Sequence, residues 1–525
     1  MKSKTPGQAI GKNQSKKTII VIVIAAIAVM AVLSKTLFTG NKENGIAAIP
    51  SATYEQGKTL AAQYCQSCHL LPDPSLLDKK SWKTLLPEMG LNLGIHTPSV
   101  QSIAQEDQGF YPTKPAMTDA EWQSILAYYD AAAPEALQRP AGIVPANPGL
   151  PYFSLLPAPD FLVRPNLWAS CVKIENSVSP ARLFVFDANS QQLFLFSQDG
   201  FLDSAHVNGM IVDMQFYNGE IFACSMGNQL RMGADKDRNG SVFPVVVSAS
   251  GKLQVKAPLF TGLARPVQVL PADMDNDKRT DFLICEFGKL TGSLTLMRNT
   301  GTGKYDKKVL RNLPGSVKVQ LVRNAQTGLQ DVWALFAQGD EAIIRFTNKG
   351  NGQFDESTML RFPPVYGSTS FELADMNNDG FTDIVYACGD NGDGTPILKP
   401  YHGVYIYVND GNNHFTQQYF YPVNGCYKVI ARDFRKTGKT DLAVIGYFTD
   451  ASKPEEWFFY LENKGGLSFN VFGAPPSTGI TNALTMDAGD FNGDGKPDLI
   501  IGNDFASNNP QRKGPLFIIL ESVSQ

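Results

Sequence analysis

Five aspartates recur at nearly even spacing through the second half of the chain, and an apolar run follows each one. They are Asp281 (FLIC), Asp331 (VWALFA), Asp383 (IVYA), Asp441 (LAVI) and Asp498 (LIIG). A Gly-rich loop and a second strand follow each run. A period of about 50 residues with several short strands per unit is typical of propeller blades. The repeats therefore predict an all-β propeller over residues 161–525.

The number of blades follows from the second strands, which end in turns such as RNTG, TNKG, VNDG and ENKG. Two weaker copies, at 182–196 and 220–229, raise the count to about seven four-stranded blades, with six or eight as alternatives. The last copy stops after PLFIILES, so its fourth strand is missing. Because an edge strand needs a partner, we expect residues 152–165, or the stretch near 170, to supply it.

Three repeats open with alternating oxygen-bearing side chains. These copies are Asp490, Asn492, Asp494 and Asp498; Asp375, Asn377, Asp379 and Asp383; and Asp273, Asp275, Asp277 and Asp281. Such side chains in a tight turn converge on a hard cation. Lys278 replaces a glycine and weakens the third copy, while Arg435 and Thr437 predict no metal in the copy that begins at Asp433. The alternative is that acidic turns merely cap hairpins through Asx hydrogen bonds.

These units resemble the FG-GAP/VCBS repeat family, as in the propeller of integrin α subunits. The resemblance covers roughly residues 180–525 and is specific in the three complete copies. It implies calcium in their D-x-[DN]-x-D-G-x-x-D loops, which gives two or three Ca²⁺ ions. Such calcium would be structural. A half motif, from Asp235 to Gly240, is a candidate for a fourth site.

The first half of the chain carries a different motif. Cys65-Gln-Ser-Cys68-His69 is the C-x-x-C-H pattern of c-type haem attachment, in which two thiols form thioethers and the imidazole reaches the iron. A zinc site would require a second ligand pair, and the chain has no second C-x-x-C or H-x-H. A redox dithiol would sit on a βαβ pattern, which the flanking sequence lacks. We therefore expect one covalent haem c.

The flanks of this motif predict helices. Gly57, Leu60, Ala61 and Tyr64 fall at helical spacing, and Thr118 with Glu121 forms a capping box before a second apolar stripe. With these helices, residues 53–137 resemble the class I cytochrome c family. The resemblance implies a small all-α domain with His69 as proximal iron ligand and a methionine as distal ligand.

The distal ligand has three candidates. Met117 lies at the separation from His69 that the family favours, but it abuts the helix cap Thr118. Met89 lies closer to His69, in a loop-like Pro-Glu-Met-Gly context. His96 ranks behind both and would lower the haem potential relative to methionine. Core packing is the alternative role for either methionine.

The N-terminus predicts export. Residues 1–17 hold five lysines and no acid, and residues 18–34 form an apolar stretch that we interpret as an uncleaved transmembrane helix; a cleaved signal peptide is the alternative. Residues 35–52 would be a linker, and 138–160 a stiff Pro-rich linker. The chain is then a multidomain protein of the bacterial inner membrane, with its N-terminus in the cytoplasm and its bulk in the periplasm.

The net charge and the remaining cysteines exclude some classes of function. A net charge of −4 argues against a nucleic-acid partner. Cys171, Cys224, Cys285, Cys388 and Cys426 fall on or near apolar strands, where buried free thiols are the default. Long polar loops, which carry Glu286, Asp390 and Asp504 among others, would gather on one propeller face and offer a surface for a glycan or a protein.

These features favour single-electron transfer by a membrane-anchored cytochrome, whose propeller docks a redox partner or ligand. Two alternatives stay open. In one, the propeller is a dehydrogenase that passes substrate electrons to the haem, although the sequence shows no cofactor motif or acid–base pair for it. In the other, the propeller is an adhesion or scaffold module. Fold analogy does not choose among them.

Overall fold

The fold is described from a computed structural model of the 525-residue chain. It describes residues 50–523 except 108, 141, 229–237, 393, 394, 396, 451, 476, 477, 481 and 506–512. The predicted cytoplasmic tail, transmembrane helix and most of the following linker therefore lie outside the described residues, as do Asp235 and Asp237 of the half motif. Within the described residues, no helix is both long and apolar enough to cross a membrane.

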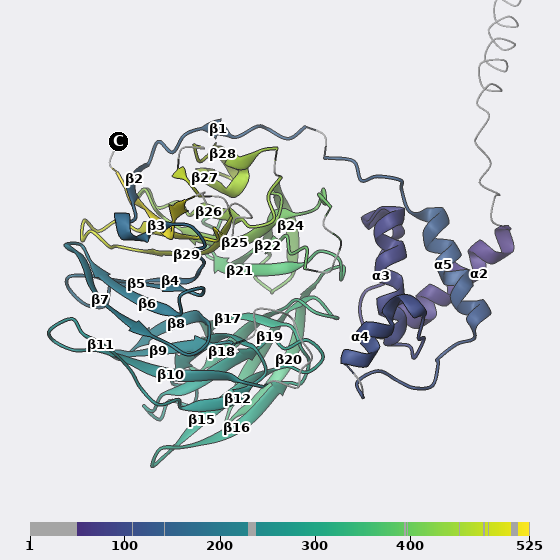
Figure 1. Cartoon of the computed structure of the whole chain (residues 1–525), viewed down its shortest axis with the longest axis horizontal. Helices are drawn as coiled ribbons and strands as arrows, with labels where there is room; N and C mark the ends of the chain where they lie inside the picture. Colours follow the sequence, from purple (N-terminus) through teal and green to yellow (C-terminus); the bar gives the residue numbers. More distant parts are fainter. Residues whose placement is uncertain are drawn as a thin grey trace, which may run out of the picture. The chain divides into compact units, whose positions relative to one another are not determined.

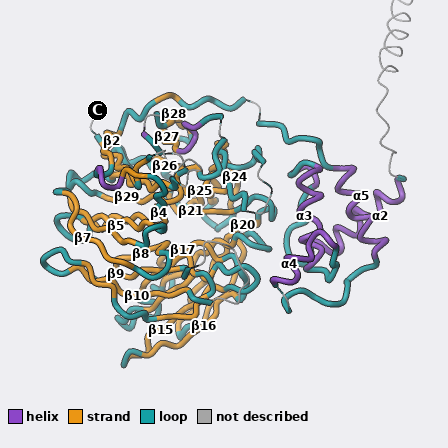
Figure 2. Tube along the Cα trace, viewed as in Figure 1, coloured by secondary structure: helices purple, strands orange, loops and turns teal. Residues whose placement is uncertain are grey.

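Helices fill the described segment that precedes the propeller (Figure 2). They are α2 (Ser51–Cys65), α3 (Lys79–Leu91), α4 (Gln101–Glu106) and α5 (Asp119–Ala132), with short 3-10 turns at Pro74–Leu76 and Pro98–Val100. The capping box is confirmed, because Thr118 Oγ1 accepts from the Glu121 N–H and Glu121 accepts from the Thr118 N–H. Helices α2 and α5 cross at Gly57, where an added Cβ would lie 2.0 Å from the Ser124 carbonyl oxygen. Glycine thus permits this close crossing.

Seven sheets form the propeller, which confirms the blade count (Figure 1). The first blade comprises β4 (Ala169–Glu175), β5 (Arg182–Asp187), β6 (Gln192–Ser197) and β7 (Gly200–His206). The second comprises β8 (Ile211–Tyr217), β9 (Glu220–Ser225), β10 (Gly240–Val247) and β11 (Leu253–Val255), with β12 (Phe260–Leu263) also paired to β10. The third comprises β13 (Pro266–Ala272), β14 (Asp281–Glu286), β15 (Ser293–Gly301) and β16 (Lys304–Arg311). Neighbouring strands within each blade are antiparallel.

The next three blades continue the same order. The fourth blade comprises β17 (Ser316–Arg323), β18 (Gln330–Phe336), β19 (Ala342–Gly350) and β20 (Gln353–Arg361). The fifth comprises β21 (Ser368–Ala374), β22 (Asp383–Cys388), β23 (Gly403–Asn409) and β24 (Phe415–Pro422). The sixth comprises β25 (Cys426–Arg432), β26 (Asp441–Gly446), β27 (Phe458–Gly465) and β28 (Ser468–Gly473). The first strand of each blade contacts the first strand of the next, and β29 of the last blade returns to β4. The blades therefore close into a ring.

The last blade takes its outer strand from the start of the array. Its strands are β29 (Ala483–Gly489), β30 (Asp498–Asn503), β32 (Phe517–Ser522) and β2 (Phe153–Pro157), and β2 pairs with β32 from Phe153–Ser522 to Pro157–Ile518. The expected closure by residues 152–165 is confirmed. A second piece of the predicted linker, β1 (Asn147–Pro148), pairs with β28. These parts of 138–160 thus belong to the propeller sheets. A short bridge joins β3 (Val163–Arg164) to β31 (Gly514–Pro515).

The second strand of a blade is its most buried. Strands β14, β22, β26 and β30 are buried at every residue, because each is covered on both faces by neighbouring blades, which explains their unbroken apolar runs. Cys224, Cys285 and Cys388 are buried near the ends of such strands, as expected. Cys224 and Cys285 hold equivalent positions opposite Asp213 and Gln268, whereas Cys388 lies one residue further along, opposite Ser368. Burial raises the pKa of the Cys285 thiol to about 12, as befits a core thiol.

The seven innermost strands share one irregularity. Each shows a register shift against the second strand of its blade, at 169/171, 211/213, 266/268, 316/318, 368/370, 426/428 and 483/485. The residue after the shift occupies the same place in every blade. Six such residues line the central channel: Asp213, Gln268, Lys318, Ser370, Lys428 and Thr485.

Side chains from the inner strands also join neighbouring blades. Gln268 accepts a hydrogen bond from the Val319 N–H of the next blade at 2.6 Å, and Gln320 accepts one from Leu373 N–H at 2.9 Å. Between the last blade and the first, Asp487 accepts from the Ile174 N–H at 2.9 Å. Polar residues on these strands therefore help to hold the ring together, because they satisfy backbone donors of the adjacent sheet.

Candidate functional site

The aspartate that closes each repeat is a buried backbone cap. Asp281 accepts hydrogen bonds from the N–H groups of Met274, at the start of its loop, and of Asn299, in the third strand of its blade, at 2.9 and 2.7 Å. Asp383 and Asp498 make the same pair of contacts, and Asp331 and Asp441 accept from the third strand. The five aspartates therefore hold loop and strand together in every copy, whether or not the metal motif is complete.

The loops before these aspartates share one backbone conformation. The first aspartate accepts from the N–H of the sixth residue: Asp273 from Lys278, Asp375 from Gly380, Asp490 from Gly495 and Asp433 from Gly438. The fourth and sixth residues have positive φ in all four loops. Lys278 adopts φ +67° at the sixth position, where the other loops have glycine. The lysine therefore does not change the fold of its loop.

The loop at Asp273 brings its carboxylates closest together. Side-chain oxygens of Asp273, Asp275 and Asp281 lie within 4.8 Å of one another. Burial, followed by the charges of Asp277 and Asp273, raises the pKa of the Asp275 carboxyl. Its Oδ1 is buried without a hydrogen-bond donor among the described residues. Acceptors that crowd together in this way fit a hard divalent cation.

The other two complete loops have an amide in the third position. Asn377 donates to Asp379 at 2.7 Å, and Asn492 accepts from the Asp494 N–H at 3.0 Å. Among the described residues, the loop at Asp273 gives the only cluster of three carboxylates, although its sequence departs furthest from the motif. In that loop Asp277 also forms an ion pair with Arg279.

Lys278→Gly is expected to tighten calcium binding at the Asp273 loop by about two- to fivefold, because it removes an exposed positive charge beside the carboxylates and suits the left-handed backbone there. Isothermal titration of the chelator-treated full-length chain with Ca²⁺ measures this. Lys436→Gly is the matched control, since Lys436 also has positive φ (+55°) but lies in the loop without the metal motif. Equal changes from both variants would show that the effect is not at a metal.

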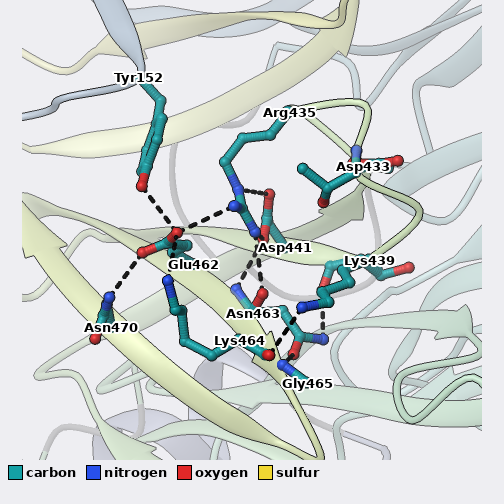
Figure 3. Close-up of polar contacts among 12 residues, drawn as sticks. Tyr152, Asp433, Arg435, Lys439, Asp441, Glu462, Asn463, Lys464, Gly465 and Asn470 are labelled. Atoms are coloured by element: carbon teal, nitrogen blue, oxygen red, sulfur yellow. Dashed lines mark hydrogen bonds and ion pairs between the residues drawn. The ribbon is translucent and has the colours of Figure 1, made fainter. Parts of the chain in front are cut away.

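In the copy at Asp433, an arginine occupies the place of a predicted metal ligand (Figure 3). Arg435 stands where the other loops have Asp275, Asn377 or Asn492, and its guanidinium makes two hydrogen bonds of 2.9 Å to the oxygens of Asp441. It also donates to Glu462 at 3.0 Å and to the Asn463 carbonyl at 3.0 Å. These hydrogen bonds to Asp441, together with its charge, raise the pKa of Arg435.

A second incomplete copy uses a related arrangement. Arg345 contacts the buried Asp331 at 2.7 Å, and its guanidinium lies 5.9 Å from the Trp333 ring. Two of the five closing aspartates thus have an arginine partner in the structure. The composition of the loop at 433 predicts the lack of metal there, but it does not reveal that Arg435 links Asp441 to Glu462, because Glu462 lies on another strand.

The haem-attachment motif lies at the C-terminal end of α2. Cys65 is the last residue of the helix, a turn follows, and Cys68 is exposed. His69 is half-buried, and its Nδ1 lies 2.8 Å from the Leu70 carbonyl oxygen. With a proton on Nδ1, this contact orients the ring and leaves Nε2 as the ligand nitrogen. The donor set and its arrangement therefore fit a c-type haem.

The surroundings of Cys65 do not favour a reactive dithiol. Burial, together with the nearby Cys68, raises the pKa of the Cys65 thiol to about 11. Redox-active thiols have lowered pKa values, typically because they lie at helix N-termini or beside cations, whereas this one ends a helix. The described residues also provide no cluster of metal ligands around Cys65 and Cys68.

The structure separates the three candidates for the distal ligand. Met117 is 7% exposed and belongs to the apolar cluster of the helices, against which Cys65 packs. Met89 is 38% exposed and lies inside α3, so its loop-like context was misjudged; Pro87 is accommodated within that helix. His96 is exposed, with Nε2 3.1 Å from the Pro112 carbonyl oxygen. Of the three candidates, Met117 alone is buried, a position that also suits core packing.

The polar loops of the propeller are more engaged than their sequence suggests. Glu286 is wholly buried and accepts from the Ala264 N–H at 2.8 Å, so it is a structural cap instead of a surface ligand. Asp504 is buried and accepts from Tyr447 Oη at 2.6 Å, and Asp450 pairs with Arg139 at 2.6 Å. Asp393, Asn508, Asn509 and Arg512 lie outside the described residues.

Two segments of the propeller match models of known repeats. An FG-GAP-like repeat matches residues 326–386, and an FG-GAP repeat matches residues 483–519. The propeller carries FG-GAP repeats. The first match spans Asp331 and the loop from Asp375 to Asp383, and the second spans the loop from Asp490 to Asp498. No curated protein matches the chain in sequence.

Solved propellers of low sequence identity also resemble the chain. A virginiamycin B lyase from Staphylococcus aureus, crystallised with quinupristin, is 12% identical over 71% of this chain and 99% of that one, with a TM-score of 0.43. The N-terminal domain of Nup159 is 11% identical over 72% and 97%, with a TM-score of 0.39. These similarities are too weak to bear on function.

Proposed function

We propose that the chain is a membrane-anchored, extracytoplasmic c-type cytochrome that transfers single electrons, and that its FG-GAP propeller docks a partner. The observation that carries this proposal is the C-x-x-C-H motif at the end of α2, with Cys65 packed against the helical core. Cys65 and Cys68 would hold one haem c through thioethers, and His69 would be its proximal ligand.

The residues around the motif suit this role. When bound, the haem would accept and release one electron at its iron. The chain supplies the environment: the contact between His69 and Leu70 orients the imidazole, and the buried Trp82, Tyr129 and Met117 would exclude water from one side. Met117 would give the second axial ligand, and a thioether in that position raises the haem potential.

The propeller would give this cytochrome a stable docking module. Two or three calcium ions would hold the loops that begin at Asp490, Asp375 and Asp273, where they would balance the acidic side chains. The apolar segment 18–34 would anchor the chain in the bacterial inner membrane and leave the helices and the propeller in the periplasm. A periplasmic or membrane-bound redox protein is the expected partner, and the loop face would bind a protein or a glycan.

The full-length chain, produced with haem-maturation machinery and kept in detergent, tests the proposal. We expect one covalent haem per chain after denaturation and a reversible one-electron titration. Cys65→Ala with Cys68→Ala should lose the haem, whereas Cys171→Ala with Cys426→Ala, which alters two buried propeller thiols, should keep it. A folded wild-type chain without covalent haem would show that the proposal is wrong.

A further inference from the structure

The centre of the propeller contains a cavity of about 1130 Å³, lined by side chains from all seven inner strands. Its lining is rich in charge despite its depth. Lys173 pairs with Asp213 at 3.2 Å, and Lys318 pairs with Glu372 at 2.8 Å. Charges that are removed from bulk water usually require such partners.

One lysine in this channel lacks an acidic partner. Lys428 is half-buried on β25, and no hydrogen bond or ion pair reaches its ammonium group from the described residues. The acids whose charges act on Lys428 are Asp487 and Asp213. Both have other partners, since Asp487 accepts from the Ile174 N–H at 2.9 Å and Asp213 accepts from Gln215 at 3.0 Å. Burial, with the charges of Lys173 and Lys318, lowers the pKa of Lys428 to about 8.

A second unpartnered group lies on the neighbouring blade. Ser370 holds the same position on β21 that Lys428 holds on β25, directly after the register shift. Ser370 is 3% exposed, lines the cavity, and its Oγ has no hydrogen-bond partner among the described residues. One residue earlier, Thr369 Oγ1 donates to the Cys426 carbonyl at 3.1 Å and joins the two strands.

More donors without acceptors line the same cavity. Arg265 directly precedes β13, and its Nε and Nη1 are buried without partners among the described residues. Trp168 directly precedes β4, and its indole Nε1 is also buried without a hydrogen-bond partner among the described residues. Both residues stand at the end where the inner strands begin. A buried donor without a partner destabilises the folded chain, so an acceptor in this cavity would be favoured.

We propose that the central channel binds a small oxyanion, with the Lys428 ammonium as its main charge partner and the Ser370 hydroxyl as a hydrogen-bond donor. Carboxylate or phosphate oxygens offer the acceptors that these groups lack. Arg265, at the end where the inner strands begin, adds positive potential that draws anions inward. The site is independent of the haem and calcium sites, so its failure would leave the proposed electron transfer untouched.

The test is isothermal titration of the full-length chain with inorganic phosphate and, separately, with succinate. Saturable binding of either at one site per chain supports the proposal, and the stronger probe tells phosphate from carboxylate chemistry. Lys428→Met should weaken binding about tenfold or more, because it removes a charge-assisted hydrogen bond. Lys349→Met is the matched control: it removes one charge from an exposed ion pair with Asp355 and should change binding less than twofold.

If Lys428→Met folds poorly, Ser370→Ala provides an independent test of anion binding, because it removes only the hydroxyl. It should weaken binding severalfold and leave the circular dichroism spectrum unchanged. Absence of saturable binding for both anions would overturn the proposal and leave a channel filled by water. Binding that both variants retain at full strength would overturn it as well, because the anion would then sit elsewhere.

Discussion

In the proposed cytochrome, Met117→Ala is expected to lower the haem potential, because it would remove the methionine ligand of the iron. Met117 is the buried candidate, and its loop is fixed in place because Ala116 N–H donates to the Leu93 carbonyl at 2.9 Å. The adjacent Thr118 caps α5 through the Glu121 N–H. If this thioether is the ligand, its loss removes the group that raises the haem potential.

The oxidised spectrum and a potential titration measure this effect. Met89→Ala is the matched control: it removes the same side chain from the exposed surface of α3, and it should leave both the methionine–iron band and the potential unchanged. His96→Ala should behave in the same way. If Met89→Ala abolished the band and Met117→Ala did not, the last turn of α3 would have to unwind when haem binds, and the assignment to Met117 would be wrong.

Arg435→Met is expected to destabilise the propeller by about 3–5 kcal/mol, because it leaves the buried Asp441 without its cation. Glu462 keeps its ion pair with Lys464 at 3.3 Å. Asp441 is wholly buried and Glu462 is almost so, and Arg435 contacts both. The midpoint of thermal unfolding of the full-length chain should fall. Lys439→Met, in the same loop, removes only a contact with the Lys464 carbonyl and should stay within about 0.5 kcal/mol.

The same loop offers a rescue. Arg435→Asn together with Thr437→Asp restores the motif of the complete copies around Asp433, Gly438 and Asp441. Its backbone already matches theirs, so this double variant should bind one Ca²⁺ more than the wild type. It should recover stability in calcium and lose it when a chelator is added. If calcium left its melting temperature unchanged, the view that arginine stands in for a cation would be wrong.

The sequence predicted the propeller well because its strongest signal has a single physical cause. Runs such as LAVI and LIIG are unbroken since their strands are buried on both faces, and each is introduced by an aspartate that caps the backbone. The sequence also predicts that the last blade takes a strand from elsewhere, because its edge strand would otherwise leave backbone groups unpaired. Phe153–Pro157 supplies that strand. Both inferences rest on local patterns.

Other features could not be predicted from the sequence, because they depend on contacts with residues distant along the chain. The prolines from Pro140 to Pro159 predict a linker, yet β1 within it pairs with β28. Pro87 suggested a loop at Met89, but the helix continues past it. The channel residues left a signal that could have been read: the inner strands SVKVQLVR and IVDMQFY alternate polar with apolar residues. Such alternation places polar groups on one face of a strand.

The pairing of β2 with β32 fixes when the ring can be completed. Phe153 leaves the ribosome long before its partner Ser522, so an early segment must wait, unpaired, for the very last strand. The final blade then locks only once β32 has been synthesised. Such a long closure makes assembly slow and leaves any chain truncated before β32 with an open edge, which invites aggregation. The synthesis of β32 would thus act as a check on the closure of the ring.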